Sequence, residues 1–210
     1  MPVGPTSAQA DFELQEFKTV GLEPRLRVDW AAENTFTVLI VGGSQGSAAL
    51  NAGVAEWCAL GIPHGVTLIW ATGRAHYGMH AHLASDRVRV EPYLSPISDA
   101  YAVADVAVTR AGAMTIAELC AWGIPSVLVP LPTAAQDHQA HNARTLAAAG
   151  AAIHLPQTAY DGAALQETLH ALQRQPAVRE TMARAARVRG RPDAAARIAE
   201  AIATLVLQLP

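Results

Sequence analysis

The chain has 210 residues, of which 51% are hydrophobic and 16% charged, and this balance excludes a long disordered chain. The formal net charge is -3, whereas general nucleic-acid binders are usually basic, so a nucleic-acid partner is not expected. Cys58 and Cys120 are too few for a disulfide scaffold. Both lie in apolar stretches with a helical pattern, so we expect buried free thiols.

Residues 1–35 are polar and rich in proline, and we interpret them as a linker-like lead-in. From Phe36 onward, short apolar runs alternate with helical patterns. The runs are mostly continuous rather than alternating, which favours strands covered on both faces, as in a parallel sheet. The predicted strands are 36–41, 66–70, 87–90, 105–108, 126–129 and 151–155. The predicted helices between them are 46–61, 75–84, 97–104, 113–122 and 137–149.

After Leu155 the pattern is helical only, over 161–173, 176–189 and 192–207, with Gly190 and Pro192 separating the last two segments. The alternation of strand and helix predicts right-handed βαβ units. We therefore expect the α/β class: a Rossmann-like, doubly wound parallel sheet over residues 36–210 with a helical C-terminal tail. No run reaches the roughly 18–20 apolar residues that a membrane-spanning helix needs.

Ligands of open parallel sheets bind outside the carboxyl ends of the strands, so the turns that follow the strands are the places to search. The first such turn, Gly42–Ser47, is rich in glycine and leads into a helix. Glycine lets a phosphate approach the backbone, and a helix N-terminus offers free N–H groups. The spacing is not G-x-G-x-x-G and there is no P-loop lysine. An anion site is favoured, and a plain tight turn is the alternative.

The second turn follows the strand at 105–108 and opens the helix that begins near Gly112. The N–H groups of Ala113, Met114 and Thr115 are expected to point at a ligand above the sheet, and a diphosphate suits them. Glu118 lies one turn further on, where its carboxylate can accept hydrogen bonds from a ribose diol. The alternative for Glu118 is a favourable charge near the start of a helix.

The loop after the strand at 126–129 carries a dense cluster of amide, imidazole and carboxylate groups, which suits several sugar hydroxyls at once. These residues are Gln136, Asp137, His138, Gln139, His141 and Asn142. A metal site at His138 and His141 is disfavoured because no third ligand has suitable spacing. In the loop 91–96, two prolines stiffen a backbone that can face the edge of a base, although Tyr93 and Leu94 also suit a core. G-x-S-x-G and C-x-x-C are absent, which disfavours a covalent hydrolase or a zinc enzyme.

Four of these segments together resemble the MurG family of N-acetylglucosaminyltransferases: GGSQGS at 42–47, ADVAVTRAGAMTIAE at 104–118, GIPSVLVP at 123–130 and DHQAHNA at 137–143. The resemblance spans about residues 36–205. It implies the C-terminal, donor-binding half of a two-domain GT-B fold, with the N-terminal half absent. The general base is then expected in that other half, and no catalytic residue is assigned in this chain.

The resemblance also implies roles for single residues. Ser44 contacts the donor, the backbone of Leu94 faces uracil, and the helix start at Ala113, Met114 and Thr115 lies over the diphosphate. Glu118 binds the ribose hydroxyls and Gln139 contacts the sugar, while relatives often carry glutamine where this chain has His138. The full set of expected substrate-binding residues is Gly43, Ser44, Gln45, Leu94, Ala113, Met114, Thr115, Ile116, Ala117, Glu118, His138 and Gln139. No metal or cofactor is implied.

By resemblance, the chain binds UDP-N-acetylglucosamine and is part of an inverting transferase that converts lipid I into lipid II in peptidoglycan synthesis. The complete enzyme would be cytoplasmic and peripheral to the inner face of the cell membrane, with lipid I reaching it through the N-terminal half. Two alternatives stay open: a nucleotide-sugar-binding module without activity of its own, and a related sugar-nucleotide epimerase.

Overall fold

The computed structural model describes residues 35–207, so the predicted lead-in lies almost wholly outside the described residues. Those residues belong to two units, which divide after Gly190, and each is described by itself. The larger unit holds a sheet whose strands run β3-β2-β1-β4-β5-β6, and every neighbouring pair is parallel. The strands are β1 (Phe36–Val41), β2 (Val66–Ala71), β3 (Val88–Glu91), β4 (Val106–Thr109), β5 (Ser126–Leu128) and β6 (Ala152–His154). This order confirms the predicted Rossmann-like, doubly wound sheet.

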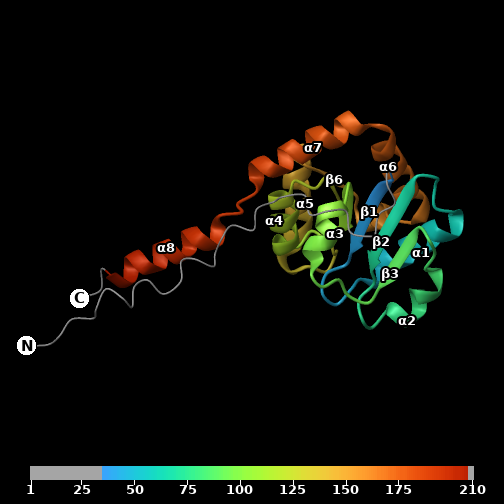
Figure 1. The fold of residues 1–210 in the computed structure, drawn as a ribbon, viewed down its shortest axis with the longest axis horizontal. Coiled ribbons are helices and arrows are strands. Elements are labelled where there is room, and N and C mark those ends of the chain that lie inside the picture. The colour runs from blue at the N-terminus through green and yellow to red at the C-terminus, as the bar shows by residue number, and fades with distance from the viewer. Residues whose placement is uncertain (1–34, 208–210) are drawn as a thin grey trace, which may run out of the picture. The chain divides into compact units, whose positions relative to one another are not determined.

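Helices cover both faces of the sheet (Figure 1). On one face, apolar side chains of α1 and α6, with Met182 of α7, pack against alternate residues of the central strands. On the other, α3 and α4 cover residues of opposite parity such as Leu39 and Ile69. The helices of this unit are α1 (Ala48–Leu60), α2 (Tyr77–His80), α3 (Ile97–Val103), α4 (Ala113–Trp122), α5 (His138–Ala148), α6 (Gly162–Arg174) and α7 (Pro176–Arg189). The described residues of this unit also form three short 3₁₀ turns: η2 (Ala81–Leu83), η3 (Ala135–Asp137) and η4 (Gln157–Ala159).

The smaller unit contributes one described element, α8 (Ala194–Leu207), which confirms the predicted helical tail. No helix among residues 35–207 is both long and apolar enough to span a membrane.

Two expectations from the sequence need correction. The helix predicted over 75–84 is a four-residue α2 followed by the 3₁₀ turn η2. Neither element has a fully buried residue, and the partly buried Leu83 of η2 packs against the core, which is too little apolar contact to stabilise a longer helix. The strand predicted over 87–90 is not covered on both faces: β3 lies at the edge of the sheet and its burial alternates. There Arg89 and Glu91 form a partly exposed ion pair, with Nε and Oε1 2.8 Å apart.

The two cysteines are free, as expected. Cys120 is buried and Cys58 is half-buried. Burial raises the pKa of the Cys58 thiol from 9.0 to about 11, and it also raises the pKa of Cys120. Both thiols therefore stay protonated near neutral pH, which makes them poor nucleophiles.

Candidate functional site

The direction of the chain through the sheet reverses at one place, between the neighbouring strands β1 and β4. From β1 the chain moves outward to β2 and β3, and it then returns to β4 on the other side of β1. Ligands of open parallel sheets bind beyond the carboxyl ends of the strands at such a point. The turn Gly42–Ser47 follows β1 and the turn at Arg110–Gly112 follows β4, so both predicted turns lie at this crevice.

The turn after β1 depends on glycine for two separate reasons. Gly43 and Gly46 have φ of 92° and 76°, which side chains rarely adopt. At Gly46 the backbone also lies directly against the turn after β2, where an added Cβ would be 2.1 Å from the carbonyl oxygen of Thr72. In the adjoining helix, the buried amide of Asn51 fixes this approach: Nδ2 donates to that same carbonyl at 2.8 Å and Oδ1 accepts from the indole of Trp70 at 3.0 Å.

Helix α4 begins without a side-chain cap at Gly112, and its first recorded helical bond runs from the Ile116 N–H to the Gly112 carbonyl at 3.0 Å. Within the described part of the chain, the preceding N–H groups of Ala113, Met114 and Thr115 have no recorded acceptor. The side of Gly112 that a Cβ would occupy is open, since an added Cβ there would meet nothing within 4 Å. The helix therefore presents free amide donors and its positive end to the crevice.

Arg110 connects the two turns. Its Nε and one terminal nitrogen lie 3.1 and 2.8 Å from Ser47 Oγ, and the other terminal nitrogen donates to the carbonyls of Val129 and Pro130. Every one of these recorded partners is neutral. Burial lowers the pKa of Arg110 below its ordinary value, but guanidinium groups stay charged in proteins. A positive charge without a carboxylate partner among the described residues thus lies between the starts of α1 and α4.

Two cavities open at this edge of the sheet. The first has a volume of about 270 Å³ and is lined from the turns after β1, β2 and β3 and from α3 and α4. Six of the expected substrate-binding residues line it: Gly43, Ser44, Leu94, Met114, Thr115 and Glu118. Its other walls are largely apolar or aromatic, among them Pro92, Ile97 and Tyr101. This combination of an apolar wall and a few polar groups is typical of small-molecule sites.

Glu118 is held in place inside the first cavity. The Tyr101 hydroxyl donates to its Oε2 at 2.7 Å. Burial raises the pKa of Tyr101, and the hydrogen bond to Glu118 raises it further, so the phenol stays a proton donor. Oε1 has no recorded partner among residues 35–207 and can accept hydrogen bonds from a diol.

The second cavity, of about 450 Å³, adjoins the first, since Gly43 and Thr115 line both. Arg110, Ser47 and the first residues of α1 form one side, and Gln139 and Gln157 lie among its other lining residues. Gln139 accepts a hydrogen bond at Oε1 from the Leu131 N–H at 3.0 Å, which leaves its amide hydrogens available to a ligand. The two cavities thus run from an apolar pocket, past free amides and a cation, to neutral polar side chains.

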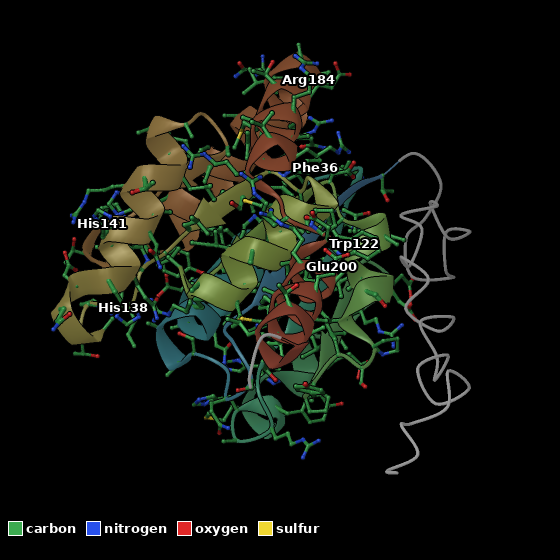
Figure 2. All side chains as sticks on the ribbon, turned by 90° about the vertical axis from the view of Figure 1, so that its left-hand side faces the viewer. Phe36, Trp122, His138, His141, Arg184 and Glu200 are labelled. Atoms are coloured by element: carbon green, nitrogen blue, oxygen red, sulfur yellow. The ribbon has the colours of Figure 1, made fainter. Side chains whose placement is uncertain are left out.

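The remaining expected residues lie elsewhere. Ala113, Ile116 and Ala117 line a third cavity of about 340 Å³, which also borders Asn142 and Arg189. Gln45 and His138 line none of the three cavities, and both are exposed. Figure 2 shows His138 and His141 along α5. Across residues 35–207, no group of three or more metal-binding side chains could hold an ion.

Sequence reasoning did not assign roles to Ser47, Tyr101, Arg110 or Gln157, all of which line one of the two cavities at the sheet edge. For Arg110 the signal was present, because a lone arginine directly follows a buried strand. For Gln157 a signal was also present, because it lies in the turn after the last predicted strand, whereas Tyr101 lies within a helix, where the search rule does not apply.

Replacing Ser47 by alanine is expected to lower the free energy of unfolding by about 1 kcal/mol, the usual cost of losing an N-cap. Ser47 Oγ accepts from the Leu50 N–H at 3.3 Å and from Arg110, and alanine supplies neither contact. Urea unfolding measures the effect, and Ser85→Ala is the control because that side chain is exposed. Equal losses in the two variants would contradict the assigned role of Ser47.

The chain is similar to known proteins in both sequence and fold. The model of the glycosyltransferase family 28 C-terminal domain matches residues 37–198. A relative from Xanthomonas oryzae pv. oryzae is named UDP-N-acetylglucosamine--N-acetylmuramyl-(pentapeptide) pyrophosphoryl-undecaprenol N-acetylglucosamine transferase. It is 46% identical over 169 residues, which is 79% of this chain and 38% of that protein. A relative from Sorangium cellulosum with the same name is 41% identical over 174 residues, 80% of this chain and 43% of its own length. The chain therefore spans about two fifths of these relatives.

Among solved structures, Acinetobacter baumannii MurG matches with a TM-score of 0.72 and 30% identity, over 82% of this chain and 53% of that one. The calicheamicin glycosyltransferase CalG4 matches with a TM-score of 0.60 over 85% of this chain and 47% of its own. At 22% identity the second likeness shows the fold alone.

Proposed function

Because the chain belongs to the glycosyltransferase family 28 C-terminal domain family, we propose that it binds UDP-N-acetylglucosamine as the donor half of an N-acetylglucosaminyltransferase of peptidoglycan synthesis. The observation that carries the proposal is the junction of the two cavities, where the turn after β1 faces the uncapped start of α4. The names of relatives at 41% and 46% identity support the sugar nucleotide.

The chemical gradient along the two cavities supports one direction of binding. The apolar pocket at Leu94 suits a uracil ring, and Glu118 beside it suits the ribose diol. The free amides of α4 and the charge of Arg110 come next and suit a diphosphate. Gln139 in the second cavity suits the hexosyl group. The order of these protein groups therefore matches the order of uracil, ribose, diphosphate and hexose in one nucleotide sugar.

We further propose, from the family resemblance, that transfer is an inverting displacement. An acceptor hydroxyl attacks the anomeric carbon, the bond from that carbon to the β-phosphate oxygen breaks, and UDP departs. Negative charge develops on the departing phosphate, where fixed N–H donors and a guanidinium stabilise it most. No covalent intermediate on the protein is needed.

No residue of this chain is proposed as the general base or as a contact of the acceptor. The chain spans only 38% to 43% of the two relatives described above. We place the base and the lipid I contacts in an N-terminal half, which this chain would meet to produce lipid II at the inner face of the cell membrane.

Titration calorimetry with the full chain tests the proposal. UDP-N-acetylglucosamine is expected to bind and UDP-glucose to bind more weakly. Transfer of radiolabelled sugar to lipid I is expected only after an N-terminal half from a relative is added. Failure to bind either nucleotide sugar would contradict donor binding, whereas transfer by the chain alone would contradict the placement of the base.

A further inference from the structure

Gln157 stands out among the residues of the second cavity because its side chain has an unmet hydrogen-bonding requirement. Its Oε1 atom is buried and has no hydrogen-bond partner among the described residues. Buried polar atoms in folded proteins are nearly always paired, since leaving one unpaired costs free energy. Gln157 also lines the cavity with Gln139, Arg110 and Ser47, so the missing partner can come from a ligand there.

The backbone that carries Gln157 is firmly anchored. Gln157 begins η4, directly after Pro156 and shortly after β6 ends at His154. The Ala159 N–H donates to the Pro156 carbonyl at 2.9 Å, and the Tyr160 N–H donates to the Gln157 carbonyl at 3.2 Å. At the far end of η4, the Tyr160 hydroxyl donates to the Leu50 carbonyl of α1 at 2.9 Å. The Tyr160 hydroxyl ties η4 to α1, so the backbone at Gln157 is positioned in advance of ligand binding.

The chemistry of the unpaired atom restricts which part of a nucleotide sugar can meet it. A diphosphate carries only acceptor oxygens at neutral pH, so it cannot pair with the Gln157 carbonyl oxygen. A sugar hydroxyl or an amide N–H can donate to that oxygen. Gln139 complements it with its own free amide hydrogens.

We propose that Gln157 is a specificity-determining residue for the hexosyl group of the donor, accepting a hydrogen bond from a hydroxyl or N–H of that sugar. This inference rests on the proposed function, because it assumes that the diphosphate lies at α4 and Arg110. It adds a contact from η4, beyond the residues that the sequence assigned to the sugar. The contact distinguishes a nucleotide sugar from the bare nucleotide.

The test compares UDP with UDP-N-acetylglucosamine on the full chain by titration calorimetry. In Gln157→Met, which keeps the length of the side chain but removes its amide, Kd for the nucleotide sugar is expected to rise about five- to tenfold. Kd for UDP is expected to stay within about twofold, because UDP carries no hexosyl group. Gln157→Asn, which withdraws the amide from the cavity, is expected to show the same selective loss.

Gln175→Met is the matched control, since Gln175 is exposed and lines none of the three cavities. It is expected to leave both affinities unchanged. The inference is overturned if both Gln157 variants bind the nucleotide sugar like the wild type, or if they lose UDP and the nucleotide sugar equally. Absence of UDP binding in the wild type would instead contradict the proposed function. Unchanged UDP binding in the Gln157 variants would show that these variants fold.

Discussion

Replacing Gly46 by alanine is expected to lower the free energy of unfolding by about 3–5 kcal/mol and to abolish measurable UDP binding. A Cβ at this position would lie 2.1 Å from the Thr72 carbonyl oxygen and 2.8 Å from the Gly73 Cα. Both are backbone atoms, which cannot rotate away as a flexible side chain could. The positive φ of 76° adds strain for any L-residue. Urea unfolding and titration calorimetry measure the two effects.

Gly43→Ala is the matched control in the same turn. Its φ is also positive, at 92°, but an added Cβ would meet nothing within 4 Å. Only the conformational cost remains, so a loss of about 1–2 kcal/mol is expected. Equal losses of stability in the two alanine variants would contradict the claim that Gly46 is needed for the close approach of the turns after β1 and β2.

Replacing Glu118 by alanine is expected to weaken UDP binding by about 1–3 kcal/mol, the usual cost of losing hydrogen bonds to a charged group. The carboxylate lines the first cavity and is oriented by the Tyr101 hydroxyl at 2.7 Å. Alanine removes the acceptor that we assign to the ribose diol. Titration calorimetry with UDP measures the loss.

Two further variants separate ligand contact from support of the fold. Tyr101→Phe removes the hydrogen bond to Glu118 but keeps the carboxylate, so a loss of less than about 1 kcal/mol is expected. Glu167→Ala removes an exposed carboxylate of α6 that lines none of the three cavities, and no loss is expected. Unchanged UDP affinity in Glu118→Ala would remove Glu118 from the proposed site.

The sequence was most informative where local signals and the topology of the sheet agree. Apolar continuity located the strands, and their alternation with helical segments predicted the parallel sheet. Gly112 predicted the start of α4, which the structure places at Ala113, and the end of that helix at Trp122 also matches. The rule that ligands bind at the carboxyl ends of parallel strands then pointed to Gly42–Ser47 and to the turn at Arg110–Gly112, because these turns follow β1 and β4.

Other features depend on contacts between distant segments and carry no local signal. The helical pattern over 75–84 could not reveal that this segment has no fully buried residue, which limits α2 to four residues. Tyr101 reaches Glu118 from within α3, away from any turn that follows a strand. Ile116 and Ala117 belong to the same motif as Glu118, yet the turn of the helix directs them to the third cavity.

A crystal structure of the full chain with UDP tests the central claim most directly. The account predicts the diphosphate within hydrogen-bonding distance of the N–H groups of Ala113, Met114 and Thr115, with uracil in the first cavity. UDP bound elsewhere, or a start of α4 filled by the protein's own side chains while UDP is present, would contradict it.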